Sequence, residues 1–190
     1  MISFMEIICK DLILRPWLNS DIEELVQIAN DKSIYDNLRD AFPFPYTYKD
    51  AENWIAFTEK NNNPIRFFAI CCNDKLIGSI GIVFKEDIYC KNAEIGYYIG
   101  NKYRGKGYIT QAIQAILKYI FFNFDIIRIY AEPFANNIAS RKVLEKNNFI
   151  CEAIFKQYVI KNGLIQDSCI YSILKSDYLQ NNMLQNDAKF

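Results

Sequence analysis

The fold is decided by residues 95–122, which read IGYYIGNKYRGKGYITQAIQAILKYIFF. The first five, Ile95 to Ile99, have the apolar and aromatic character of a buried strand, and residues 100–107 form a basic turn with three glycines. Apolar side chains then recur at i, i+3, i+4 and i+7, the spacing that keeps one face of a helix against a core. Strand, turn and helix therefore form one unit. The helix is predicted from Ile109 to Phe122, with a buried face made of Ile109, Ala112, Ile113, Ile116, Leu117, Ile120 and Phe121.

The turn between this strand and helix has the chemistry of an anion site. Arg104, Lys106 and glycine amides stand at the predicted helix N-terminus, where unpaired N–H groups and the helix dipole attract negative charge. A phosphate-bearing ligand is therefore indicated. Gly100, Gly105 and Lys106 nearly match a P-loop, but Gly107 stands where a P-loop has the serine or threonine that holds magnesium. A nucleoside-triphosphatase site is disfavoured, while a purely structural turn stays an alternative.

Composition limits the classes of function. At 190 residues the chain is long enough for one domain with a sizeable core. Its 22 basic and 22 acidic residues balance, so no overall field favours nucleic acid or a membrane surface, and neither partner is expected. The absence of histidine excludes His-based triads and makes a catalytic metal unexpected. The chemistry must use carboxylates, hydroxyls, amines or backbone groups.

Cysteine usage and the N-terminal residues bear on location. The six cysteines show no C-x-x-C spacing, which favours reduced and mostly buried thiols in a cytosolic protein. Residues 1–9 contain Glu6 and lack the charged region and cleavage site of a signal peptide. No apolar run approaches the roughly 20 residues of a membrane-spanning helix. We therefore expect a cytoplasmic location.

The first third of the chain predicts one strand and two helices. A strand over residues 12–15 is stopped by a proline. Ser20, with Glu23 three residues later, has the pattern of a capping box for the helix that follows. The aromatic segment 41–46, with two prolines, is expected to be irregular, either a binding loop or aromatic packing over a helix pair. Thr47 then caps a second helix.

The rest of the chain has mainly strand patterns. A helix is predicted between about Ile138 and Asn147, and residues 176–190 are expected to form a polar tail that frays. The elements add up to one α/β (α+β) domain over residues 1–175, with a mixed, mostly antiparallel sheet and about four helices. The predicted strands, of which the first two and the last two form hairpins, are residues 67–72, 76–84, 93–99, 126–132, 149–160 and 164–174.

Two blocks of sequence carry a family resemblance. The turn Arg104-Gly105-Lys106-Gly107-Tyr108-Ile109 resembles the Arg-x-x-Gly-x-small turn with which GNAT acetyltransferases bind the pyrophosphate of acetyl-CoA. Residues 137–149, NIASRKVLEKNNF, are similar to the Asn-x-x-Ser segment ending in Glu-Lys-x-Gly-Phe of one branch, which contains ribosomal-protein N-terminal and spermidine-type acetyltransferases. Two positions depart from the pattern. Ile109 replaces a small residue and is expected to crowd the turn, and Asn148 replaces a glycine, whose left-handed conformation asparagine tolerates.

The resemblance implies an acetyl-CoA site. In the family, the strand before the turn splays from its neighbour, which would let pantetheine pair with free backbone at Tyr98, Ile99 and Gly100. Asn137 would hydrogen-bond the pantetheine arm. The diphosphate would bind the amides of Arg104, Gly105, Lys106, Gly107 and Tyr108.

The resemblance also implies catalytic roles. Glu94 is the leading general base, directly or through a water, because its position matches an acid in related enzymes, and a half-exposed strand carboxylate is the alternative. Ser140 is the leading proton donor to the sulfur, because Leu144 stands near the position of the tyrosine that other members use. An ordinary first-turn serine is the alternative. Further hydroxyls nearby, for which core packing is expected, are Tyr97, Tyr98 and Tyr130.

As a whole, the resemblance implies N-acetyl transfer from acetyl-CoA to a primary amine by direct attack in a ternary complex. A protein or peptide N-terminus is the preferred acceptor, ahead of polyamines and aminoglycoside-like amines. The alternative from another class is a non-catalytic acyl-CoA-binding or sensing module that keeps the scaffold without the chemistry. The sequence does not select between a monomer and a homodimer.

Overall fold

The computed structural model describes residues 6–61 and 64–187, and its centre is one eight-stranded sheet. The strands are β1 (Ile7–Ile8), β2 (Ile13–Arg15), β3 (Phe67–Cys72), β4 (Lys75–Phe84), β5 (Asn92–Ile99), β6 (Arg128–Ala131), β7 (Ile150–Lys161) and β8 (Leu164–Leu174). Their order is β1-β2-β3-β4-β5-β6-β8-β7. Only β5 and β6 pair in parallel, so the sheet is mixed and mostly antiparallel, as predicted.

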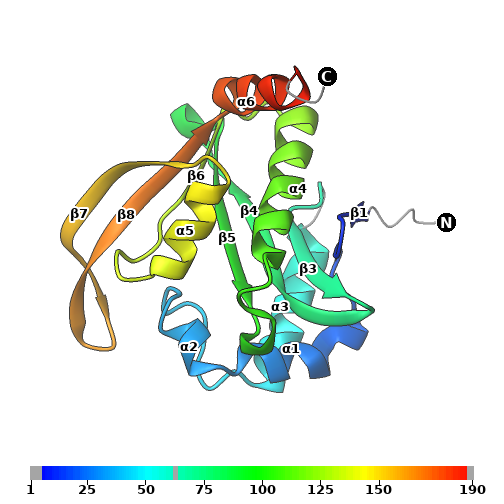
Figure 1. Cartoon of the computed structure of the whole chain (residues 1–190). Coiled ribbons are helices and arrows are strands. Elements are labelled where there is room, and N and C mark those ends of the chain that lie inside the picture. The colour runs from blue at the N-terminus through cyan, green and yellow to red at the C-terminus, as the bar shows by residue number, and fades with distance from the viewer. Residues whose placement is uncertain (1–5, 62–63, 188–190) are drawn as a thin grey trace.

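Helices cover both faces of the sheet (Figure 1). They are α1 (Ile22–Ala29), α2 (Lys32–Tyr35), α3 (Tyr48–Asn61), α4 (Tyr108–Asn123), α5 (Ile138–Lys146) and α6 (Lys175–Asp187). In Figure 1, α4 and α5 lie in front of the sheet and α3 lies behind it, while the long β7–β8 hairpin extends to one side. The helix predicted over residues 109–122 is α4, and it forms one side of the molecule.

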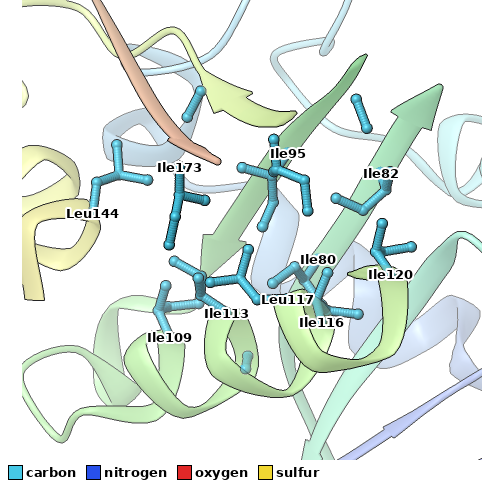
Figure 2. Close-up of a cluster of buried hydrophobic side chains, with 14 of the residues drawn as sticks. Ile80, Ile82, Ile95, Ile109, Ile113, Ile116, Leu117, Ile120, Leu144 and Ile173 are labelled. Carbon is cyan, nitrogen blue, oxygen red and sulfur yellow. The ribbon is translucent and has the colours of Figure 1, made fainter. Parts of the chain in front are cut away.

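The larger hydrophobic core lies between α4 and the sheet. All seven apolar side chains predicted for the inner face of α4 are buried. They pack against Ile80 and Ile82 of β4 and Ile95 of β5 (Figure 2). A second core, which includes Leu25 of α1 and Ile55 of α3, covers the opposite face of the sheet. Burial on both faces explains why the central strands have nearly continuous apolar sequences.

β5 and β6 diverge soon after they meet. Their register joins only Asn92–Glu94 to Arg128–Tyr130, whereas β5 pairs with β4 along Ala93–Ile99. Beyond Glu94, the edge of β5 that faces β6 is therefore not paired with that strand. This is the splay that the family resemblance implied, and it positions the candidate site.

The predicted capping box before α1 is wrong. The N-cap of α1 is Asp21, and its side chain makes no cap hydrogen bond to the helix. Instead the Asp21 carboxylate accepts the Leu18 amide at 2.9 Å and pairs with both terminal nitrogens of Arg15 at 2.7 Å. A buried bidentate ion pair outweighs the Ser20-x-x-Glu23 pattern here. The Thr47 cap is confirmed, since its hydroxyl accepts from the Asp50 amide at 3.3 Å.

The sequence missed three elements and misjudged the C-terminal segment. β1, α2 and α6 were not predicted, so the described residues hold six α-helices rather than about four. Residues 175–187 are helical and not a fraying tail, while residues 188–190 lie outside the described residues. Tyr178 packs its ring on Phe121 of α4 with centroids 5.2 Å apart, so one aromatic contact anchors a polar segment.

The expectation that most thiols are buried is also wrong. All six cysteines are free, but Cys90 and Cys151 are exposed, and only Cys71 and Cys169 are fully buried. Among the described residues, no helix is long and apolar enough to cross a membrane.

Candidate active site

A cleft of about 1150 Å³ opens where β5 and β6 part. Its lining includes the turn before α4, the first turn of α5, and the loop between α2 and α3 (residues 36–47). Gly100 and Lys106 are not among the described residues that line the cleft. The predicted site residues that do line it are Glu94, Tyr98, Ile99, Arg104, Gly105, Gly107, Tyr108, Asn137 and Ser140.

The turn before α4 presents backbone N–H groups to the cleft. Gly105 and Gly107 have φ angles of +76° and +79°, while a Cβ at either would meet nothing within 4 Å. The left-handed backbone, and not crowding, requires glycine at both positions. In the part of the chain that the structure describes, the N–H groups of residues 105–108 have no protein partner. They stand at the positive end of the α4 dipole, where an anion is stabilised.

Two details of the predicted turn need correction. The Arg104 amide donates to the Asn101 carbonyl at 3.2 Å, so the amides of the predicted set that have no protein partner are those of residues 105–108. Ile109 does not crowd the turn, because its side chain is 8% exposed and points into the core with Ile113 and Leu144 (Figure 2). Asn148 has the left-handed backbone expected of it, with a φ of +62°.

The backbone groups of β5 that face the gap belong to residues one position away from the predicted ones. The Gly100 amide donates to the Ile77 carbonyl, and the Gly100 carbonyl accepts from the Tyr103 amide, each at 2.9 Å. The Gly100 backbone is therefore not free, contrary to the prediction. Backbone groups alternate in direction along a strand, so Tyr98 also directs its N–H and C=O toward β4. The groups that face the gap are those of Tyr97 and Ile99.

Asn137 and Ser140 meet Tyr97 across the gap. Asn137 is the N-cap of α5, and its Oδ1 accepts the Ser140 amide at 3.1 Å, which leaves Nδ2 for any ligand contact. The Ser140 Oγ lies 2.8 Å from the Tyr97 Oη, and either oxygen can be the donor. The Ser140 hydroxyl therefore contacts another side chain and not only the backbone of its own helix turn. Tyr97, besides packing in the core, places its hydroxyl at the gap.

The Tyr97–Ser140 pair holds its protons at neutral pH. Burial raises the pKa of Tyr97 to about 12, although the hydrogen bond with Ser140 partly opposes this rise. The phenol is consequently protonated throughout the physiological range. A protonated hydroxyl pair at the open strand edge can supply a proton to a group in the gap.

Glu94 lies on the opposite face of β5, among cations. Its Oε1 accepts from Arg39 at 2.5 Å, its Oε2 accepts from Lys85 at 2.8 Å, and the Tyr130 hydroxyl donates to Oε2 at 3.4 Å. Burial raises the pKa of Glu94, but the hydrogen bond from Lys85 and the charges of Arg39 and Lys85 outweigh it and hold the pKa below its usual value. Glu94 is therefore ionised and able to receive a proton.

The aromatic segment 41–46 packs over neighbouring elements and also reaches the cleft. Phe42 packs against Tyr46 and Tyr98, with ring centroids 5.1 and 5.4 Å away, and Tyr46 is buried. Phe42 also lines the cleft, together with Trp54 and Phe57 of α3. Burial raises the pKa of Tyr98, so the phenol of this aromatic wall is uncharged at neutral pH.

Sequence reasoning missed Arg39, Lys85 and Glu132, which surround or neighbour Glu94. Arg39 also reaches Glu132 at 3.4 Å. No local pattern marks Arg39, because its loop meets β5 only in the folded chain. The parallel pairing of Glu94 with Tyr130 is a signal that could have found Glu132, two residues beyond. Among the described residues, no group of three or more His, Cys, Asp or Glu is placed to hold a metal ion.

Comparison with known proteins identifies the family. A family model described as an acetyltransferase (GNAT) domain matches residues 11–150. The chain belongs to the GNAT acetyltransferase family. A GNAT domain makes it an acetyl-CoA-dependent acyltransferase, and its relatives are named N-acetyltransferases.

Two relatives show how far the similarity of this GNAT protein extends. It is 30% identical over 177 residues to the uncharacterized N-acetyltransferase YnaD of Bacillus subtilis (strain 168), covering 92% of this chain and 99% of the relative. It is 32% identical over 107 residues to the ribosomal-protein-serine acetyltransferase of Escherichia coli (strain K12), covering 56% of this chain and 59% of that enzyme.

Solved structures share the fold of this GNAT protein. RimL, a ribosomal L7/L12 alpha-N-protein acetyltransferase in complex with coenzyme A, superimposes with a TM-score of 0.81 at 23% identity, over 90% of this chain and 98% of RimL. The microcin C7 self-immunity acetyltransferase MccE, in complex with acetyl-CoA and AMP, gives a TM-score of 0.76 at 23% identity, over 87% and 93% of the two chains. At these identities the likeness establishes the fold.

Proposed function

We propose that this GNAT protein transfers acetyl from acetyl-CoA to the α-amine of a protein or peptide N-terminus. The observation that carries the proposal is the separation of two proton-handling groups by β5. Glu94 lies on one face of the strand, and the Tyr97–Ser140 pair lies on the other. Successive strand residues point to opposite faces, so an amine can approach from one side while a thiol leaves on the other.

The residues present fit acetyl-CoA. The N–H groups of residues 105–108 suit a diphosphate at the start of α4. The backbone of Tyr97 and Ile99 would pair with the amide groups of pantetheine along the open edge of β5, as an added strand does. Asn137 Nδ2 would contact the same arm. Acetyl-CoA would supply the activated acetyl group.

The chain's own groups would then manage the protons of a single displacement. The amine nitrogen forms a bond to the acetyl carbon while the carbon–sulfur bond breaks. The acceptor's ammonium would first lose one proton to solvent, and Glu94, directly or through a water, would accept the second proton as the amine attacks. Ser140 would donate a proton to the departing thiolate and would be resupplied by Tyr97, whose hydroxyl lies 2.8 Å away. Glu94 would thereby prevent a protonated amide, and Ser140 would prevent a free thiolate.

The preference for a peptide acceptor draws on relatives and on the site. Relatives include the E. coli ribosomal-protein-serine acetyltransferase and the [ribosomal protein uS5]-alanine N-acetyltransferase, which is 30% identical over 84 residues, 44% of this chain and 43% of that enzyme. Phe42 and Trp54 line the same cleft as Glu94 and would offer apolar contacts to residues after an N-terminus.

The acceptor class is tested by competition. Wild-type protein and acetyl-CoA are mixed with equal amounts of a Ser-Ala-Ala-Ala peptide, its N-formylated form, spermidine and kanamycin, and acetylated products are counted by mass spectrometry. We expect the free peptide to be acetylated first. Faster acetylation of spermidine or kanamycin would show that the acceptor is a small amine and not a peptide. Binding of acetyl-CoA with no acetylated product from any acceptor would favour the sensing module.

A further inference from the structure

An arginine occupies the space between two carboxylates beside the open edge of β5. The Arg39 guanidinium lies 2.5 Å from Glu94 Oε1 and 3.4 Å from Glu132 Oε2. The Glu94 and Glu132 side chains are 15% and 23% exposed, whereas Arg39 is 65% exposed. All three residues line the cleft. Two mostly buried carboxylates thus share one cation that stands largely in solvent.

Arg39 is the cation that can leave. Lys85 holds the other oxygen of Glu94 at 2.8 Å, is 30% exposed, and has its ammonium 5.5 Å from the centroid of the Tyr130 ring. Its backbone amide donates to the Asn92 carbonyl of β5 at 3.0 Å, so it is fixed beside the sheet. Arg39, in contrast, belongs to the loop after α2, and an exposed ion pair of this kind contributes little to stability. A cation must remain between the carboxylates when Arg39 moves, because they would otherwise repel each other.

Gly96 leaves open space beside this pair. A Cβ at Gly96 would meet nothing within 4 Å, and its φ lies outside the left-handed range that requires glycine. Gly96 lies in the interior of β5, two residues from Glu94 on the same face, and it lines the cleft. A glycine inside a strand costs stability. Neither packing nor backbone conformation explains it here, whereas an unobstructed cleft does.

We propose that the acceptor's primary ammonium binds between Glu94 and Glu132, over Gly96, by displacing the Arg39 guanidinium. This inference rests on the proposed amine acetyltransferase function and names the subsite that such an acceptor uses. Glu132 is then a specificity-determining residue that selects cationic amines, and Arg39 is an internal occupant of the site. A small residue at position 96 gives the carbon next to the amine its room.

The steady-state kinetics of four variants test the proposal, with the Ser-Ala-Ala-Ala peptide and spermidine as acceptors at saturating acetyl-CoA. Arg39→Ala removes the competing cation, so kcat/KM for the acceptor should rise about two- to fivefold, the range expected for one exposed ion pair. Arg39→Lys keeps a competing cation in the loop, so it should raise kcat/KM less than Arg39→Ala does. Glu132→Gln should raise the acceptor KM about tenfold with little change in kcat, since it removes a charged binding partner. Gly96→Val should raise the acceptor KM by about as much.

The matched control is Lys49→Ala, which removes another exposed cation, paired with Glu52 at 3.2 Å on α3. It should leave the kinetics unchanged. The KM for acetyl-CoA should be unchanged in all variants. A lower kcat/KM in Arg39→Ala, or an unchanged acceptor KM in both Glu132→Gln and Gly96→Val, would overturn the subsite while leaving the acetyltransferase function intact. No acetylation by the wild type would overturn the proposed function itself.

Discussion

At the scale of single residues, Glu94 is the group whose environment constrains the chemistry most. Lys85 and Arg39 hold its pKa below the usual value in spite of burial. It is therefore ionised before any substrate binds. The lowered pKa makes it a weaker base, which its position at the cleft offsets. The Glu94 side chain is only 15% exposed and pairs with two cations, so it does not match the alternative of a half-exposed strand carboxylate.

Replacing Glu94 tests its role as proton acceptor. Glu94→Gln keeps the size and one acceptor oxygen but cannot take a proton, so we expect kcat to fall on the order of 10²- to 10⁴-fold. The Kd for acetyl-CoA, measured by calorimetry, should not change. A variant with wild-type kcat would remove Glu94 from the mechanism.

The direction of the Glu94 pKa shift also predicts a pH profile. Because the folded pKa is lowered, this group stabilises the fold above the unfolded value of about 4.3, and that contribution is lost only as the pH falls through the lower folded pKa. Glu94 is then fully ionised from about pH 5.5 upward. The rise of kcat/KM with pH should therefore follow the deprotonation of the acceptor's α-amine, at about pH 8. An additional limb near pH 6 that disappears in Glu94→Gln would contradict this assignment.

The Tyr97–Ser140 contact makes a second residue-scale prediction. Ser140→Ala should lower kcat on the order of 10²-fold by removing the donor to sulfur, and Tyr97→Phe should lower it less, by about tenfold. The double variant should be no slower than Ser140→Ala, because both changes interrupt one proton path. Multiplicative losses, measured by thiol release at saturating substrates, would show that the two hydroxyls act separately.

At the scale of elements, the turn before α4 depends on backbone conformation. Gly107 has a φ of +79° as the N-cap of α4, so Gly107→Ala forces an L-residue into the left-handed region, at a cost of roughly 1 kcal/mol. Its methyl group would also stand beside the amides that we assign to the diphosphate. We expect the KM for acetyl-CoA to rise about tenfold or more with a small fall in Tm. A normal KM would place the diphosphate elsewhere.

The same scale shows which elements could be predicted from sequence. α4 and the β3–β4 hairpin have strong local patterns, a continuous apolar periodicity in one case and two apolar runs around a tight turn in the other. α2 is four residues long, and α6 is polar apart from contacts such as that of Tyr178 with Phe121. Their formation depends on a cap and on tertiary packing that a local window does not contain.

At the scale of the whole molecule, the residues proposed to hold the cofactor form a motif in the sequence, whereas those proposed to hold the acceptor do not. Residues 104–108 lie in one continuous turn, so their chemistry is visible as a motif. The Arg39–Glu94–Glu132 cluster joins a loop, a strand and a strand end that are distant along the chain. Which backbone groups of β5 face the gap likewise cannot be predicted without the register between β5 and β4. That register leaves the groups of Tyr97 and Ile99 facing the gap.

The central claim is that this fold is a working acetyltransferase and not a binder of acyl-CoA. The most direct test mixes wild-type protein, acetyl-CoA and the Ser-Ala-Ala-Ala peptide, and follows free thiol and acetylated peptide together. We expect both to appear at equal rates, neither to appear with the N-formylated peptide, and Glu94→Gln to slow both alike. Saturable binding of acetyl-CoA without peptide-dependent thiol release would contradict it.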